Sequence, residues 1–348
     1  MKRKIDIRVV LMLVGICFIG FLTFLTRSYY NNVLDKIGVD NMENVKKYKY
    51  HFVMIVDNGE TPFWQDVFAS TKKEAEKNGV LLELWGNNQA ENYSVADFME
   101  MGIAARVDGI ILEYTGQRQL ESKIALAKEA GIPVVTVLKD ATNSGRISYV
   151  GVNSYQLGQE YGRKIGGLLN KDEEQARVMI LTHDNSADSS QSQIYNQINN
   201  ILVTSEQSPH IIMEEQKINI TGNFDVEETV WNIFQSQEGP PDIFVCMDET
   251  DTEAVYQAMI DFNMVGEVQV IGYYYSDQIL EAIEKGIVPT TLIIDTEQIG
   301  KYSIQALMEY LKEGRANSFY SVDLQFVDQS NVKEYLNKLE GADETEEK

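Results

Sequence analysis

Five carboxylates lie where they could bind a ligand together. Each sits at the predicted carboxyl end of a short apolar strand: Asp57, Glu60, Asp184, Asp248 and Asp295. In a parallel α/β sheet, the carboxyl ends of the strands border the crevice that holds a ligand. Carboxylates gathered there would suit a cationic or polyhydroxyl ligand. The alternative is that each carboxylate caps the helix that follows it.

An aromatic pair lies beside the first of these carboxylates. Phe63 and Trp64 begin a predicted helix directly after the first strand. Aromatic faces match the C–H patches of a sugar ring, and their quadrupole also attracts a cation. The pair could instead pack the helix onto the sheet. Its place at the helix start favours the ligand role.

The sequence offers little for covalent or metal chemistry. His51, His183 and His210 are its three histidines, and no His-x-x-x-His, Gly-x-Ser-x-Gly or phosphate-binding glycine loop occurs. His183, just after a predicted strand, is the histidine that could reach a ligand. The segment 184–188 resembles a calcium loop but lacks the turning glycine and the terminal glutamate. We therefore expect no enzyme activity, no metal and no cofactor.

Strand and helix patterns alternate along the chain. The first unit is an apolar run at 51–56, an amphipathic segment ending at Asn78-Gly79 and a second apolar run at 80–85, which together predict a βαβ unit. This alternation continues to residue 138, and a second series runs from 147 to 327. The sequence therefore predicts two α/β halves, each a doubly wound parallel sheet with helices on both faces.

The helix predicted at 154–169 is rich in glycine. Gly158, Gly162 and Gly166 recur at four-residue spacing, which resembles a membrane dimer motif. Charged residues such as Arg163 interrupt the pattern, so we expect close packing of this helix against its sheet.

The charge balance excludes one class of partner. The formal net charge is −23, from 30 basic and 53 acidic side chains, so a phosphate backbone would be repelled. Nucleic acid is not an expected partner. Acidic residues are dense at the end of the chain, and we expect 336–348 to be a disordered tail.

The N-terminus has the pattern of a membrane anchor. Basic residues at 2–8 precede the uncharged apolar run 9–26, which is long enough to cross a bilayer. No small-residue cleavage site follows it, and Ile16 before Cys17 disfavours a lipoprotein signal. We expect residues 1–30 to form a cytoplasmic flank and an uncleaved transmembrane helix. Residues 31–48 would form a stalk to an extracytoplasmic domain.

Short motifs follow one another along the rest of the chain. They are Thr61-Pro-Phe-Trp64, Asp108-Gly-Ile-Ile-Leu112, Ala130-Gly-Ile-Pro-Val-Val135, Tyr149-Val-Gly-Val-Asn153 with Gly158, Ile271-Gly272, Gly286 before Thr290-Thr291, Glu297-Gln-Ile-Gly300 and Val322-Asp-Leu324. In their order and spacing, the chain resembles the ribose/galactose branch of the type I periplasmic binding proteins over about residues 49–335.

The resemblance implies two lobes that close on a ligand. Three crossovers would join them, near 152–153, 293–296 and 318–322. The N-terminal lobe would contain 49–152 and 296–318, and the C-terminal lobe 153–295 and 319–335.

The resemblance also implies ligand contacts. Phe63 and Trp64 match the aromatic pair that stacks on the sugar, and Phe224 matches an aromatic residue of the opposite lobe. Asp248 stands where an Asn or Asp often receives hydroxyl groups.

At three further places the chain departs from the sugar-binding pattern. Leu138-Lys139 replaces an Asp-Arg pair, the segment 188–193 replaces an arginine, and Gly272-Tyr-Tyr-Tyr275 replaces Gly-Phe-Asp. We count Lys139, Gln191 and Tyr274 among the candidate ligand contacts. These departures leave the ligand class open, with a carbohydrate first.

The resulting functional hypothesis is capture of a small polar ligand for an ABC importer. A close alternative is a sensory module that signals to a membrane histidine kinase. A LacI-like repressor shares the implied fold, but it would carry a basic helix-turn-helix where this chain has the apolar run.

Overall fold

The computed structural model describes residues 48–86, 93–169, 174–183, 189–203, 210–219, 224–337 and 339. Residues 1–48 and 49–348 are separate units, and every element below belongs to the second. In the described part of the chain, no helix has the length and apolar character needed to cross a bilayer. The predicted anchor at 1–30, the stalk up to residue 47 and residues 340–348 of the predicted tail lie outside the described residues. The start of that tail, predicted to be disordered from residue 336, is corrected: Leu336 and Leu339 are helical and pack against the core.

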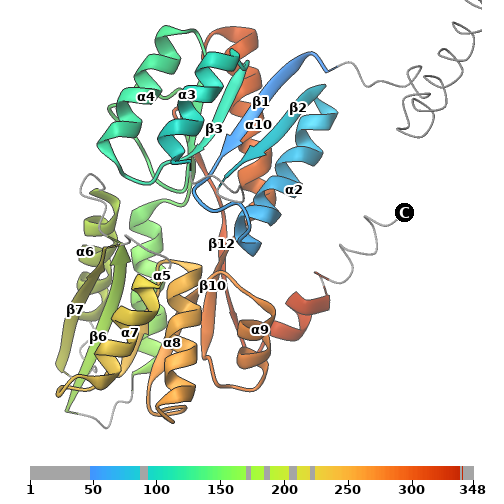
Figure 1. The fold of residues 1–348 in the computed structure, drawn as a ribbon. Coiled ribbons are helices and arrows are strands. Elements are labelled where there is room, and N and C mark those ends of the chain that lie inside the picture. Colours follow the sequence, from blue (N-terminus) through green and yellow to red (C-terminus); the bar gives the residue numbers. More distant parts are fainter. Residues whose placement is uncertain are drawn as a thin grey trace, which may run out of the picture. The chain divides into compact units, whose positions relative to one another are not determined.

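The first sheet has its strands in the order β11-β5-β4-β3-β1-β2, all parallel. They are β1 (Tyr50–Ile55), β2 (Val80–Trp85), β3 (Gly109–Glu113), β4 (Val134–Val137), β5 (Ser148–Gly151) and β11 (Phe319–Ser321). Two helix pairs cover it: α2 (Pro62–Lys77) with α10 (Thr296–Glu313), and α3 (Val95–Ala105) with α4 (Arg118–Glu129) (Figure 1).

Strand β1 shows why both faces of this sheet are covered. Phe52 and Met54 belong to the core that contains residues of α2 and α10, whereas Val53 and Ile55 belong to the core that contains residues of α3 and α4. Successive side chains of a strand point to opposite faces. A strand buried on both faces is therefore a continuous apolar run, which is the pattern found at 52–56.

The second sheet has the order β12-β10-β9-β8-β6-β7. Its strands are β6 (Gln175–His183), β7 (His210–Ile218), β8 (Ile243–Val245), β9 (Gln269–Tyr273), β10 (Thr290–Ile294) and β12 (Leu324–Asp328). Its helices are α5 (Ser154–Leu168), α6 (Ser189–Val203), α7 (Asp225–Gln235), α8 (Glu249–Asp261) and α9 (Asp277–Glu284). Strand β12 runs antiparallel to β10, which corrects the expectation of a wholly parallel sheet. The α/β class with two lobes is confirmed.

The chain passes between the sheets three times: after β5, after β10 and after β11. The last passage corrects the lobe boundary predicted at residue 318. Phe319–Ser321 pairs with β5 in the first sheet, and the ring of Phe319 stacks on Tyr149 at 5.2 Å between centroids. A strand of three residues gives too little periodicity to be recognised from sequence.

Gln298 links the second and third of these crossovers by hydrogen bonds. Gln298 donates from Nε2 to Oδ2 of Asp323 at 2.8 Å, and the Asp323 N–H donates back to Oε1 of Gln298 at 3.1 Å. The Asp295 N–H also donates to the carbonyl of Asp323, at 3.0 Å. The second and third crossovers are thus held as one hinge.

The glycine-rich helix α5 packs differently from our expectation. A Cβ added at Gly158 would lie 2.6 Å from the Cβ of Gln197 and 2.7 Å from the carbonyl oxygen of Ile194. At Gly162 it would lie 2.8 Å from the Cβ of Ile201. These glycines therefore allow close approach of α6, rather than of the sheet.

Candidate functional site

Carboxylates gather at the carboxyl edge of the first sheet. Glu113 ends β3, and Asp57 follows the neighbouring strand β1. The Asp57 N–H donates to Oε2 of Glu113 at 2.7 Å. Burial raises the pKa of Glu113 to about 7, against the lowering effect of this hydrogen bond, and the charges of Asp57 and Asp248 raise it further. Glu113 can therefore both donate and accept hydrogen bonds near neutral pH.

Asp248 brings a carboxylate from the second lobe to the same place. It follows β8, whereas Asp57 lies in the first lobe. Burial and then the charge of Asp248 raise the pKa of Asp57. The electrostatic coupling joins the carboxyl edges of the two sheets. Asp248 also caps α8, because its Oδ1 accepts from the Thr250 N–H at 3.0 Å.

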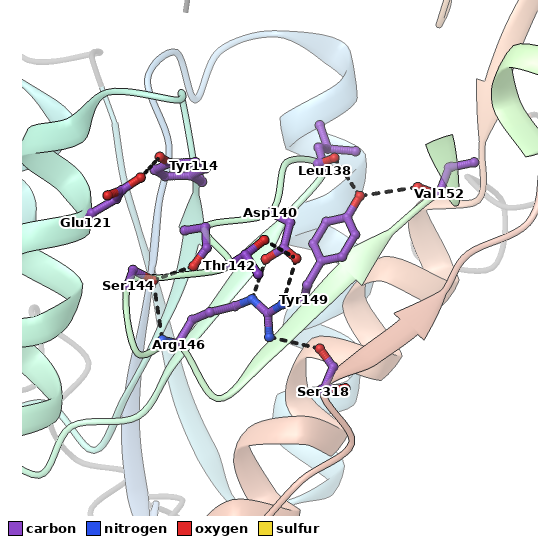
Figure 2. A network of polar contacts seen from close by, with 11 residues as sticks. Tyr114, Glu121, Leu138, Asp140, Thr142, Ser144, Arg146, Tyr149, Val152 and Ser318 are labelled. Atoms are coloured by element: carbon purple, nitrogen blue, oxygen red, sulfur yellow. Dashed lines mark hydrogen bonds and ion pairs between the residues drawn. The ribbon is translucent and has the colours of Figure 1, made fainter. Parts of the chain in front are cut away.

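Lys139 adds a positive charge beside these acids. Its charge lowers the pKa of Glu113. It follows Leu138, whose φ of 65° is left-handed. Figure 2 shows how the turn is held: the Tyr149 hydroxyl donates to the carbonyls of Leu138 at 2.8 Å and Val152 at 3.3 Å.

The loop after Lys139 is also fixed. Arg146 donates from Nη2 to Oδ2 of Asp140 at 2.7 Å and pairs with Oδ1 through Nε, and its Nη1 donates to the Ser318 carbonyl at 2.9 Å (Figure 2). The loop is thereby anchored to the segment just before β11.

A histidine and a buried carboxylate are in contact at the carboxyl end of β6. Nε2 of His183 is 2.8 Å from Oδ1 of Asp251, whose side chain is 0% exposed. Burial lowers the pKa of His183, but the hydrogen bond and charge of Asp251 outweigh it, so the pKa is raised. Burial raises the pKa of Asp251, against the effect of His183. Asp248 also raises the pKa of His183, which puts this pair close to the acids above.

The aromatic pair of α2 is buried. Phe63 is 4% and Trp64 5% exposed, and their rings meet edge to face at 5.1 Å. Thr61 caps the helix, accepting from the Trp64 N–H. Phe63 meets Tyr274 of the second lobe edge to face at 4.7 Å. Phe63 therefore packs within the structure and also lies between the two lobes.

In the described part of the chain, no ring contact joins Phe224 to Phe63 or Trp64. It is 75% exposed at the start of α7. Helix α7 follows β7, the edge strand of the second sheet, and the place of Phe224 opposite the aromatic pair stays a prediction.

Of the four other predicted ligand contacts, the structure describes the side chains of two. Asp295 caps α10 by accepting from the Gln298 N–H at 2.9 Å, and Glu60 is exposed in the loop before α2. Asp184 and the side chain of Gln191 lie outside the described residues. The calcium-like loop at 184–188 lies outside them as well.

Sequence reasoning missed several residues of this region: Asp66, Glu113, Glu249 and Asp251. The rule that selected Asp57, a carboxylate at the end of a predicted strand, would also have found Glu113. Asp66, Glu249 and Asp251 lie within helices, where no strand-end signal marks them.

The comparison with known families is decisive. Residues 52–316 match the periplasmic binding protein domain. The chain belongs to this family.

Several solved structures share the fold at low identity. The XylFII–LytSN complex is similar with 23% identity and a TM-score of 0.66, covering 81% of this chain and 98% of that one. GanP, a glucose-galactose binding protein from Geobacillus stearothermophilus, has 21% identity and a TM-score of 0.69, covering 81% and 98%. An ABC transporter solute-binding protein from Burkholderia graminis, in complex with D-arabinose, has 19% identity and a TM-score of 0.69. This match covers 82% of this chain and 97% of that one. No protein with a curated description matches the chain.

Members of this family bind solutes and are not enzymes, and the same holds for this chain. The family also implies an extracytoplasmic location. Within the described residues, no group of three or more His, Cys, Asp or Glu side chains has the geometry to hold a metal ion.

Proposed function

We propose that this protein captures a small, polar, sugar-like ligand between its lobes, outside the cytoplasm, on a membrane anchor. Its primary role is delivery of the ligand to an ABC importer. The observation that carries the proposal is the 2.7 Å hydrogen bond that joins Asp57 to Glu113 in the first lobe, with Asp248 of the second lobe near enough for its charge to raise the pKa of both carboxyls.

The charges of this region suit a polyhydroxyl ligand. Carboxylates accept hydrogen bonds from hydroxyl groups, and such charge-assisted bonds are among the stronger ones in proteins. Glu113, with a pKa of about 7, can also donate. Lys139 supplies three N–H donors for ligand oxygens. A binding site with groups on both lobes gains its full affinity only when the lobes approach each other.

Solved structures with the same fold support a sugar. GanP is a glucose-galactose binding protein, and the protein from Burkholderia graminis holds D-arabinose. The Gly272-to-Tyr275 segment and Lys139 differ from the sugar-binding pattern, so the amine and polyol classes belong in the same test.

Sensing is the second candidate function. XylFII, which shares the fold, is found in a complex with a second protein, LytSN. By analogy, the liganded state of this chain would be passed to a membrane histidine kinase. Deletion of the protein separates the roles: loss of ligand uptake indicates transport, whereas loss of a ligand-induced transcriptional response with uptake intact indicates sensing.

A thermal-shift screen tests the binding function. The full chain in detergent would be heated with sugars, polyols, amines and nucleosides. A ligand at 100 times its Kd should stabilise the protein by about 2.7 kcal/mol. A panel in which no sugar or polyol raises the melting temperature would contradict the proposal.

A further inference from the structure

One carboxylate in the first lobe is held by two tyrosines of the second. Oδ2 of Asp66, in α2, accepts from the hydroxyl of Tyr274 at 2.6 Å and from that of Tyr275 at 2.7 Å. Both tyrosines follow β9, in the second sheet. The bonds therefore join the lobes directly, residue to residue.

A second set of contacts lies beside this one. The Phe63 ring, 4% exposed, meets Tyr274 edge to face. The backbone of Phe63 also lies close enough to Glu249 of the second lobe to lower the pKa of that carboxyl, against the larger effect of burial. Glu249 is 9% exposed, and its Oε2 is buried without a hydrogen-bond partner. The starts of α2 and α8 are thus in contact across the lobes.

The backbone holds Tyr274 in place for this contact. Its φ of 58° is left-handed, a conformation that a tyrosine keeps only when its surroundings impose it. Strand β10 imposes it: the Tyr274 N–H donates to the Leu292 carbonyl at 2.7 Å, and the Tyr274 carbonyl accepts from the Thr291 hydroxyl. The ring is therefore presented to Asp66 by a rigid turn.

We propose that Asp66, Tyr274 and Tyr275 form an interlobe latch, which holds the two lobes together whether or not a ligand is bound. This goes beyond the proposed function, because the contacts are made between side chains of the protein itself. Burial and Asp66 raise the pKa of both phenols, so both remain hydrogen-bond donors at physiological pH. Opening of the latch, rather than closure of the lobes, would then limit ligand entry.

Distance measurements between spin labels test the latch in the full chain. Labels would be attached at Lys77→Cys in α2 and Lys285→Cys after α9, two side chains about 60% exposed. Cys17→Ser removes one native thiol, and Cys246, 0% exposed, is shielded from the label. Without added ligand, the labelled parent should show one dominant distance.

The test variant is Tyr274→Phe with Tyr275→Phe, which removes the hydroxyls and keeps the rings. We expect a second, longer distance to appear. The ratio of molecules at this distance to molecules at the parent distance should rise at least tenfold, equivalent to about 1.4 kcal/mol. The matched control is Tyr320→Phe. It removes a 2.6 Å bond of the same kind, to Glu309, inside the first lobe, and it should leave the distance unchanged.

Three results would overturn the latch. The parent without ligand could already show the two distances of the double variant. The double variant could keep the single distance of the parent. The control could open the lobes as far as the double variant does.

Discussion

Nε2 of His183 lies 2.8 Å from the buried Oδ1 of Asp251, and this carboxylate holds the histidine pKa above its usual value. Burial acts in the opposite direction. Asp251→Asn should therefore lower the pKa of His183 below 6.5, the ordinary value for a histidine. NMR titration of the ring protons measures it, with His183→Gln to assign the signal. A pKa that stays raised in Asp251→Asn would assign the shift to another charge.

Two glycines of α5 should respond in opposite ways to alanine. Gly158→Ala places a Cβ 2.7 Å from the Ile194 carbonyl oxygen, so we expect a loss of about 1–3 kcal/mol in unfolding free energy. Gly166 has no atom within 4 Å of its added Cβ, and Gly166→Ala should stabilise the helix by up to about 1 kcal/mol. Urea unfolding measures both. Equal effects would mean that α6 does not pack at Gly158.

Stability should fall as the pH rises from about 5 to about 8. Burial raises the pKa of Glu113 to about 7 and that of Glu249 to about 8, both from 4.5. The folded protein therefore binds these protons more tightly than the unfolded chain, and their stabilising effect is present below the unfolded pKa and is lost as the pH rises through the folded pKa.

Urea titrations at each pH measure this slope. Glu249→Gln should flatten it. Glu309→Gln is the control, because hydrogen bonds from Tyr320 and Gln305 lower the pKa of Glu309, so this carboxyl does not titrate between pH 5 and 8. A slope that is identical in Glu249→Gln and in the parent would contradict this origin.

Strand and helix patterns predicted the two α/β halves, because a strand buried on both faces is a continuous apolar run in the sequence. The apolar run at 52–56 predicted β1, and its side chains do divide between two cores. The three-residue strand β11 was too short to predict.

The site depended on strand order, which local periodicity does not contain. Phe224 is expected to oppose Phe63; it follows an edge strand and is exposed, and its role stays a prediction. Asp66 meets Tyr274 across 208 positions of sequence, and it lies inside a helix where nothing distinguishes it from a surface acid. Asp248, which follows a predicted strand, was found because the end of a strand is a local signal.

The proposed membrane anchor predicts a defined result in cells. The basic flank before the apolar run 9–26 should keep the N-terminus in the cytoplasm and the binding domain outside. Protease added to intact cells should release a soluble fragment of the domain. Resistance until the cells are lysed would reverse the topology, and release without protease would indicate cleavage.

The central claim is that carboxylates from both lobes hold the ligand. Calorimetric titration of the ligand from the thermal screen into the parent, Asp57→Asn and Asp248→Asn tests it most directly. Asparagine is also a good helix cap, so Asp248→Asn should keep the melting temperature, and Cys246→Ala, at a buried position, serves as a control that lowers stability but not affinity. We expect each Asp-to-Asn change to raise Kd more than tenfold, about 1.4 kcal/mol. Unchanged Kd in both variants would contradict a site between the lobes.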